Sequence, residues 1–356
     1  MDIEGFLEDK ALLIDKVIEK YLPRKFAKDS ILFQVIPPMY SYNLETMDKA
    51  IADPIWDMLD RGGKRWRPAL FLLICKALGK NEDDYIDFAV IPEVIHNGTL
   101  VIDDIEDTSE LRRGKPCTYK VYGLDISVNV GNAMYYMPLL SLMTKDVKLS
   151  AEVLCGVYEV YVQEMINLSL GQAMDIAWHR GLANANNVTE ADYLQMCAYK
   201  TGTLARMAAK MAAVISSAEK NLVEKLGRFA ESIGVAFQMQ DDILDLTGQE
   251  FAKKKGGVGQ DITEGKRTLM VIYTLKNANE LDRKRLVEIL DMHTSDQALR
   301  DEAIAIMQKY KAIEYTAQTA QKMVIESWNE VNCLLPTPEA KEKLQAFSEF
   351  LIKRDM

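Results

Sequence analysis

The chain has 356 residues, of which 48% are hydrophobic and 27% charged, and its formal net charge is −10. This composition is ordinary for a globular protein. The acidic balance excludes the basic face that a nucleic-acid binder usually carries, so we expect no nucleic-acid partner. An anionic small substrate stays open if metal ions or clustered Arg and Lys offset the charge.

The five cysteines are scattered, with no C-x-x-C pair and an odd total. This spacing argues against a disulfide framework and a zinc ribbon and favours a reduced compartment. The opening MDIEGFLEDK is acidic and lacks the apolar region of a signal peptide. The apolar runs are far shorter than a membrane span. We therefore expect a cytoplasmic chain with no transmembrane segment.

Helical periodicity runs along nearly the whole chain. Ile14, Val17, Ile18 and Tyr21 repeat at helical spacing, and Pro23 ends that segment. The pattern predicts further helices over 44–60, 67–79, 84–107, 126–144, 149–178, 190–215, 219–247, 267–279, 281–291, 295–309, 311–333 and 338–353. No period-2 run calls for a strand. No low-complexity linker interrupts the chain, so we expect one all-α domain spanning 1–356.

Three basic stretches follow one another along the chain. GGKRWRP (62–68) lies between two predicted helices, where glycines let the backbone approach an anion and a helix start favours one. LRRG (111–114) offers arginine forks that match phosphate oxygens. KKKGG (253–257), followed by EGK (264–266), is typical of a flap. The plainer alternatives are an ordinary turn, salt bridges to nearby acids and a solvated basic loop, respectively.

Two D-D-x-x-D clusters are the strongest chemical signal. DDIED (103–107) and DDILD (241–245) each end an apolar helical stretch. Residues i and i+4 share a helix face, so the outer acids of each cluster point together. Carboxylates on buried helices need a counter-charge, and Mg²⁺ with oxygen ligands supplies one. A solvated acidic helix end is the plainer alternative, and two copies on apolar helices disfavour it.

The histidines limit the choice of metal chemistry. A di-iron bundle would require Glu-x-x-His pairs. The three histidines are His96, His179 and His293, and none has such a partner. An all-carboxylate Mg²⁺ site therefore indicates a phosphorylated substrate. His96 lies seven residues before Asp103, about two helical turns, on the helix that leads into the first cluster.

Taken together, these motifs resemble those of the trans-polyprenyl diphosphate synthases. The match runs from about Gly62 to Lys266, and six motifs stand in family order: GGKRWRP, DDIED with LRRG, GQAMD, YKTG, FQMQDDILD and DITEGKRT. The resemblance implies a single large helical bundle of the isoprenoid synthase type with a central active-site cavity. It also implies a homodimer and a Mg²⁺-dependent prenyltransferase that joins isopentenyl diphosphate to allylic diphosphates.

The resemblance also assigns roles to individual residues. Direct Mg²⁺ ligands would be Asp103, Asp107 and Asp241, supported by Asp104, Asp242 and Asp245, with about three ions bound together with the allylic diphosphate. Isopentenyl diphosphate would be bound by Lys64, Arg67, His96 and Arg113, and the allylic diphosphate by Arg112. Around that diphosphate and the developing cation would lie Lys200, Thr201, Gln238 and Lys266, with Lys255 as the flap lysine.

Two positions depart from the family pattern. Many relatives carry a second histidine just before the first aspartate pair, where this chain has Ile102, as in eukaryotic geranylgeranyl synthases. The usual place of the flap lysine holds Gly256, and Lys255 stands one residue early. The assignment of Lys266 is therefore firmer than that of Lys255.

Product length should depend on the helical turns before Asp103. Gly98 and Thr99, then Ile95, would line the tunnel for the growing chain, and each turn adds about 5.4 Å, comparable to one isoprene unit. Small residues in the first turn predict a product of at least C20, with geranylgeranyl diphosphate the first choice. The alternatives are a farnesyl product or one of C25 and longer, then a class I terpene cyclase, then a non-catalytic subunit of a heteromeric synthase.

Overall fold

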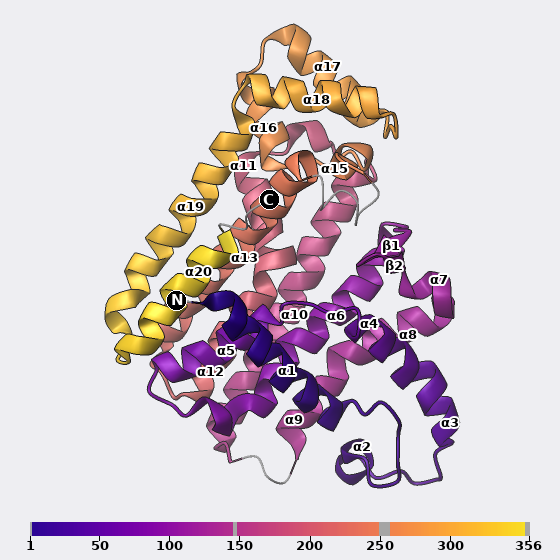
Figure 1. Ribbon diagram of the computed structural model, residues 1–356, viewed down its shortest axis with the longest axis vertical. Helices are drawn as coiled ribbons and strands as arrows, with labels where there is room; N and C mark the ends of the chain where they lie inside the picture. The colour runs from indigo at the N-terminus through magenta and orange to yellow at the C-terminus, as the bar shows by residue number, and fades with distance from the viewer. Residues whose placement is uncertain (1, 145–147, 249–256, 353–356) are drawn as a thin grey trace. The chain divides into compact units, whose positions relative to one another are not determined.

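The computed structural model describes residues 2–144, 148–248 and 257–352, and this part of the chain is almost entirely helical (Figure 1). The α-helices are α1 (Ile3–Tyr21), α2 (Ile31–Val35), α3 (Leu44–Met47), α4 (Asp53–Leu59), α5 (Trp66–Ala77), α6 (Val90–Glu106), α7 (Thr118–Tyr122), α8 (Leu124–Tyr136), α9 (Leu140–Met143), α10 (Ala151–His179), α11 (Glu190–Cys197), α12 (Thr203–Ile215), α13 (Lys220–Thr247), α15 (Gln260–Thr263), α16 (Leu269–Asn277), α17 (Glu280–Asp291), α18 (Gln297–Lys309), α19 (Ala312–Val331) and α20 (Pro338–Ile352). The all-α prediction is confirmed.

Short 3-10 and π helices interrupt several of the predicted long helices. They are η1 (Asp48–Ala52), η2 (Glu82–Ala89), η3 (Met137–Leu139), η4 (Ala185–Asn187), η5 (Ala198–Gly202) and η6 (Asn332–Leu334). The predicted helix 190–215 is thus α11 and α12 joined by a π turn, and 84–107 begins with a 3-10 helix. The spacing of apolar residues shows that a segment is helical, but it does not show where an α-helix changes to a 3-10 or π helix.

The chain divides into two compact units. Unit 1 comprises residues 1–160, 207–224 and 334–346, and unit 2 comprises residues 161–206, 225–333 and 347–356. The first aspartate cluster belongs to unit 1 and the second to unit 2. The expectation of a single domain over 1–356 stays a prediction.

One small hairpin corrects the expectation that no strands occur. Strands β1 (Leu111–Arg112) and β2 (Lys115–Pro116) pair antiparallel, with Arg112 opposite Lys115. Arg113 and Gly114 form the turn, and both have positive φ, at 53° and 76°. Two residues with positive φ are what a tight two-residue hairpin requires. Strands of two residues are too short to show alternation in the sequence.

The core of unit 1 places the first cluster by a close helix crossing. Helix α5 is buried along nearly its whole length, and α6 packs against α8. A Cβ added at Gly98 of α6 would lie 2.8 Å from the Met134 Cβ and 3.0 Å from the Gly131 carbonyl of α8. The two glycines therefore let the helices approach backbone to backbone, and this crossing fixes α6 just before its acidic end.

The core of unit 2 is centred on α13 and the helices that follow it. Ile243 and Leu246 of α13 pack in one buried cluster with Met270 of α16, Leu286 of α17 and Met307 of α18. Figure 1 shows α17 and α18 side by side. No helix in the described ranges is both long and apolar enough to cross a membrane.

Candidate active site

The acids at the end of α6 differ in their access to solvent. Asp103 and Asp107 are partly exposed, whereas the side chain of Asp104 is fully buried. Asp107 caps the helix, and its N–H donates to the Asp103 carbonyl at 2.9 Å. The two outer acids therefore share the accessible face, as their spacing predicts, and the middle acid points into the protein.

Arg112, on β1, is the partner of the buried acid. Its guanidinium donates to Asp104 Oδ1, with Nε at 2.8 Å, and its Nη2 lies 3.5 Å from Asp103 Oδ2. Burial raises the pKa of Asp104, and the Arg112 charge opposes that shift. The hairpin thus brings a cation to the acidic cluster.

Arginines from two segments act on α6 near His96. Arg113, at the hairpin turn, donates to the Gly62 carbonyl and, at 3.4 Å, to Asn97 Oδ1. Burial lowers the pKa of His96 well below its usual 6.5, and the positive charges of Arg67 and Arg113 lower it further. The charges of Arg67 and Arg113 thus act on the His96 imidazole, and we call these two arginines, with the neutral imidazole, the cationic group. A neutral imidazole there can donate one hydrogen bond to an anion.

The GGKRWRP loop is built on a buried arginine that the sequence did not single out. Arg65 is 2% exposed and binds Glu93 Oε1 at 3.0 Å, Asp15 Oδ1 at 2.9 Å and the Leu59 carbonyl at 2.9 Å. Arg67 is buried next to it in α5, whereas Lys64 is exposed. Arg65 therefore fixes the loop, and Lys64 and Arg67 stay on it as the binding candidates.

The acids of α13 repeat the division seen on α6. Asp241 is partly exposed, while Asp242 and Asp245 are buried. Asp245 Oδ2 accepts the N–H of Asp261 at 3.0 Å. Asp242 accepts hydrogen bonds from Tyr193 Oη and Gln238 Nε2, both at 2.8 Å. Asp241 is thus the most accessible acid of the second cluster.

A hydrogen-bonded chain joins two predicted residues to Asp242. Thr201 Oγ1 donates to Gln238 Oε1 at 2.9 Å, and the amide of Gln238 donates in turn to Asp242. Burial, together with the nearby charge of Asp261, raises the pKa of Asp242 to about 7, against the hydrogen bonds from Gln238 and Tyr193. A divalent cation would relieve this stored repulsion between the two acids.

Lys200 is presented by the π turn η5. Its ammonium pairs with Asp175 at 2.5 Å. The turn packs closely on α10 at Gly171. A Cβ added at this glycine would lie 2.3 Å from the backbone nitrogen of Lys200. π turns recur at functional sites, where they re-aim side chains. Here the turn directs Lys200 toward the acid of the GQAMD motif.

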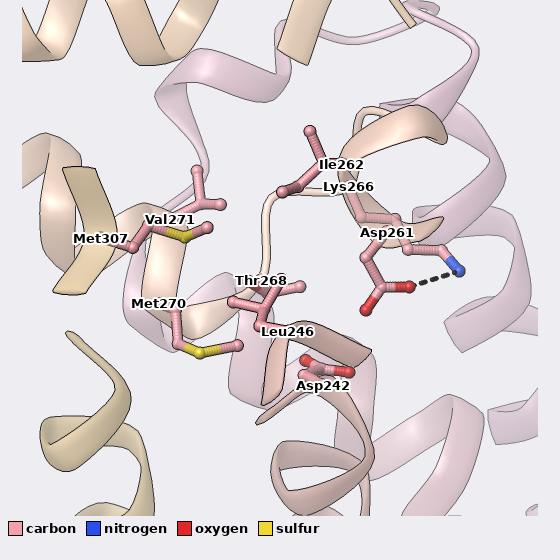
Figure 2. A pocket seen from close by; sticks show the side chains of 9 residues that line it. All are labelled: Asp242, Leu246, Asp261, Ile262, Lys266, Thr268, Met270, Val271 and Met307. Atoms are coloured by element: carbon pink, nitrogen blue, oxygen red, sulfur yellow. Dashed lines mark ion pairs between the residues drawn. The ribbon is translucent and has the colours of Figure 1, made fainter. Parts of the chain in front are cut away.

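Lys266 and Asp261 border a small pocket next to Asp242 (Figure 2). The Lys266 ammonium lies 3.5 Å from Asp261 Oδ1 and also pairs with Glu264. The side of the pocket opposite these polar groups is apolar and includes Met270 and Met307 (Figure 2). Lys266 thus lies beside the second cluster, and its assignment to the allylic diphosphate stays a prediction, whereas Lys255 lies outside the described residues.

The three predicted chain-length residues occupy two successive turns of α6, Ile95 in one and Gly98 and Thr99 in the next. Ile95 and Gly98 are buried and Thr99 is partly exposed. An added Cβ at Gly98 would lie only 2.8 Å from the Met134 Cβ of α8, so the helix crossing is enough to explain the small residue there. The Cε1 of Tyr135 would lie 3.3 Å from a Cβ at Gly98. The tunnel hypothesis therefore depends on Thr99 and Ile95 more than on Gly98.

The donor set was compared with what Mg²⁺ requires. Among the described residues, no group of three acidic, imidazole or thiol side chains could hold a metal ion by itself. Mg²⁺ commonly takes one or two carboxylates and completes its octahedron with water and substrate phosphate oxygens. Each cluster thus offers one or two accessible carboxylates, Asp103 and Asp107 on α6 and Asp241 on α13, which suits an ion that arrives with a diphosphate.

Sequence reasoning missed four residues of these sites. Asp261 and Asp175 stand inside quoted motifs, DITEGKRT and GQAMD, and an acid beside a predicted cationic residue was the available signal. Tyr193 and Arg65 gave none, because an aromatic at a helical core spacing and an arginine within a basic run have commoner explanations. Their roles follow only from the hydrogen bonds to Asp242 and Glu93.

The chain was compared with known proteins. The family model for polyprenyl synthetase matches residues 48–307. A short chain isoprenyl diphosphate synthase of Methanothermobacter thermautotrophicus is 33% identical over 84% of this chain and 88% of the relative. A geranylgeranyl diphosphate synthase of Sulfolobus acidocaldarius is 32% identical over 84% and 89%. The crystal structure of geranylgeranyl pyrophosphate synthetase from Pyrococcus horikoshii aligns with a TM-score of 0.82, 29% identity and 99% of each chain.

These matches cover the motifs on which the two acidic clusters and the cationic group stand. They confirm the isoprenoid synthase fold and the predicted enzyme class. The chain belongs to the polyprenyl synthetase family and is a prenyltransferase of that all-α fold.

Proposed function

We propose that this prenyltransferase joins isopentenyl diphosphate to allylic diphosphates and releases geranylgeranyl diphosphate as its main product. The observation that carries the proposal is a set of arginines beside α6 that is separate from the acids: Arg113 donates to the Gly62 carbonyl and to Asn97 Oδ1 of α6, and Arg67 is buried in α5 directly after the same loop. A second diphosphate-binding group is what a two-substrate condensation needs. A class I terpene cyclase ionises one diphosphate and would have no use for it.

The accessible acids are the proposed Mg²⁺ ligands, with about three ions bound only together with the allylic diphosphate. Asp103, Asp107 and Asp241 would hold them, since these are the acids that solvent reaches. Bound Mg²⁺ would neutralise the charge that develops on the leaving diphosphate. Asp104, Asp242 and Asp245 support the ligands from within, through Arg112, Tyr193 and the Asp261 N–H.

The protein's own residues prepare the carbon–carbon step. Lys200 and Lys266, with Arg112, add fixed positive charge for the departing oxygen atoms. Thr201 and Gln238, tied to Asp242, place carbonyl and hydroxyl dipoles near the allylic cation. The double bond of isopentenyl diphosphate attacks that cation, and the proton is then lost to the departing pyrophosphate. This sequence needs no strong protein base, provided that water is excluded.

Product length is proposed to be set by the turns of α6 before Asp103. Thr99 and Ile95 are the side chains of that stretch that can meet a growing chain, one turn apart. The small Thr99 leaves the first turn open, which supports a C20 product. The known relatives named above carry short-chain and geranylgeranyl names, which supports the same choice.

We further propose a homodimer in the cytoplasm. Val162, Ile166 and Leu170 form an apolar stripe on α10, and each is about half exposed, at 51–55%. Their i, i+4, i+8 spacing places them on one helix face. A contiguous apolar face of this kind supports an interface with a second copy of the chain.

The decisive assay combines the protein with Mg²⁺, isopentenyl diphosphate and, separately, C5, C10 and C15 allylic diphosphates. Products are dephosphorylated and sized by mass spectrometry. We expect a Mg²⁺-dependent linear alcohol whose main member is C20. A C15 or C25 main product would correct the length and leave the reaction class intact.

The same assay separates the rival functions. Cyclisation of an allylic diphosphate alone, with isopentenyl diphosphate never consumed, would establish the cyclase. Inactivity with every starter would favour a non-catalytic subunit. The two acidic clusters, both complete, stand against that outcome. An Arg113→Gln variant provides the matched control, because it should raise the KM for isopentenyl diphosphate far more than the KM for the allylic substrate.

A further inference from the structure

The segment 257–266 carries Asp261 and Lys266, and α13 holds one side of it. The Gly259 N–H donates to the Asp245 carbonyl at 2.9 Å, and the Asp261 N–H donates to Asp245 Oδ2 at 3.0 Å. These two bonds tie the segment directly to the last acid of the second cluster. They do not by themselves fix the rest of the segment.

The other side of the segment rests on Arg300 of α18. Arg300 is 5% exposed, and its Nη1 donates to the Val258 carbonyl at 3.2 Å. Its Nε lies 3.5 Å from the Thr294 carbonyl. A Cβ added at Gly257 or Gly259 would lie 3.3 or 3.4 Å from this side chain, so the glycine backbone lies flat against it. A buried guanidinium that donates to backbone carbonyls holds the backbone rather than another side chain.

The turn between α17 and α18 holds the far end of the same segment. Thr263 Oγ1 donates to the Thr294 carbonyl at 2.8 Å, and His293 Nδ1 lies 3.2 Å from the Thr263 carbonyl. Gly265 has φ 69°, and a Cβ there would lie 2.6 Å from the His293 ring. His293 and Thr294 therefore fix the backbone directly before Lys266. This turn is distant in sequence from every motif of the family pattern.

We propose that residues 291–300, which we call the α17–α18 corner, position Asp261 and Lys266 at the second cluster, with Arg300 as the principal positioning residue. The inference rests on the proposed function, because it assigns the corner to the binding of the Mg²⁺–diphosphate unit. Helix α18 also supplies Met307 to the pocket that Asp242, Asp261 and Lys266 line (Figure 2). One helix thus supports both the polar and the apolar side of that pocket.

Hydrogen–deuterium exchange of full-length Arg300→Gln tests the positioning role without any need for activity. We expect faster exchange in peptides covering 257–266 and unchanged exchange in α17 and the rest of α18. Arg300→Lys, which keeps a charge but loses the fork, should fall between the variant and the wild type. Unchanged exchange in 257–266, or an increase spread evenly over α17 and α18, would overturn the proposal.

Arg285→Gln is the matched control. Arg285 also joins α17 to α18, through a two-point contact with Glu302 at 2.7 and 2.8 Å, but it does not contact the segment. We expect this variant to leave exchange in 257–266 at the wild-type level. A change there equal to that of Arg300→Gln would mean that any loosening of the two helices has the same effect, which would also overturn the proposal.

Binding and kinetics then connect position to function. Calorimetric titration with Mg²⁺ and inorganic pyrophosphate should show affinity about tenfold weaker in Arg300→Gln, as for loss of a charged hydrogen bond. The KM for the allylic diphosphate should rise by a similar factor, while that for isopentenyl diphosphate stays within about twofold. Equal changes in both KM values would contradict the inference. If the wild type itself consumes no isopentenyl diphosphate, the proposed function fails, and the exchange data still decide the role of Arg300.

Discussion

The buried acids Asp104 and Asp242 show how single residues prepare each cluster. Asp104 is neutralised by an arginine, Arg112, whereas Asp242 is held by the neutral donors Tyr193 and Gln238. The first acid is therefore paired directly with a cation, whereas the second accepts these hydrogen bonds from neutral groups and the cation Lys266 lies across the small pocket from it. Burial raises the pKa of both carboxyls. At Asp242 the negative charge of the neighbouring Asp261 adds to that rise, whereas at Asp104 the charge of Arg112 opposes it.

Replacing Arg112 with Met should destabilise the protein strongly. The change leaves the fully buried Asp104 carboxylate without its cation, and breaking such a pair costs about 3–5 kcal/mol. Adding Asp104→Asn should recover much of that loss. Urea unfolding of the two single variants and the double variant measures the coupling. Additive effects would show that the pair contributes no interaction of its own.

The low pKa of His96 predicts a pH-dependent stability. Above its unfolded pKa of about 6.5 the imidazole is neutral in both states, and its stabilising contribution is complete. As pH falls, the unfolded chain takes up the proton while the folded chain resists it, so that contribution is lost toward the lower folded pKa.

Melting curves from pH 8 to pH 5 check this sign. The wild type should lose stability relative to His96→Gln below pH 6.5, by about 1 kcal/mol one pH unit lower. Parallel curves for the two proteins would place the imidazole in an unperturbed environment. Mg²⁺ and diphosphates are left out of the measurement, because a bound anion would favour the protonated ring.

At the scale of elements, helices were predictable and their interruptions were not. The ranges of α10 and α13 agree with the sequence prediction to within about two residues, because long amphipathic or apolar periods specify them. The π turn η5 and the hairpin of Arg112 arise from contacts with distant segments and local left-handed residues. Those two features carry Lys200, Arg112 and Arg113, so the sequence named these residues without showing how they are aimed.

Substitutions at Gly98 and Thr99, which are adjacent on α6, should have different effects, because only Gly98 packs against α8 at the helix crossing. Thr99→Tyr should shorten the main product by about one isoprene unit, since it fills the turn before Asp103. Gly98→Ala should leave product length unchanged and cost about 1–3 kcal/mol of stability, because its Cβ meets Met134 and the Gly131 carbonyl. Product mass spectra and melting curves read both effects. A shortened product from Gly98→Ala would show that this face of α6 lines the tunnel.

At the scale of the whole molecule, the sequence predicted the fold class and the acidic clusters. Six ordered motifs and an uninterrupted helical period were sufficient for both. Which acids of each cluster are buried and which are accessible could be learned only from the structure. The burial of Asp104 and the exposure of Asp103 depend on packing rather than on their spacing in the sequence. The α17–α18 corner lay outside every motif, and no residue type there signalled a role.

The apolar stripe on α10 predicts how assembly responds to charge. Ile166→Asp should convert the proposed dimer, of about twice 40.3 kDa, into monomers, because its interface would bury a carboxylate without a partner. Leu281→Asp, at an apolar position on α17 that is even more exposed, is the control and should leave the mass unchanged. Light scattering after size-exclusion chromatography gives both masses. A dimeric Ile166→Asp would move the interface to another face.

The π turn between α11 and α12 has a consequence for the length of the chain itself. A π turn winds more residues per turn than the flanking α-helix does. Deleting one residue, such as Ala198, would let α11 and α12 merge into one regular helix. Each residue of an α-helix advances the side-chain direction by about 100°, so Lys200 and Thr201 would rotate away from Asp175 and Gln238 with their side-chain chemistry intact. The number of residues in this stretch therefore matters as much as their identity, because it sets the direction in which Lys200 and Thr201 point around the helix axis.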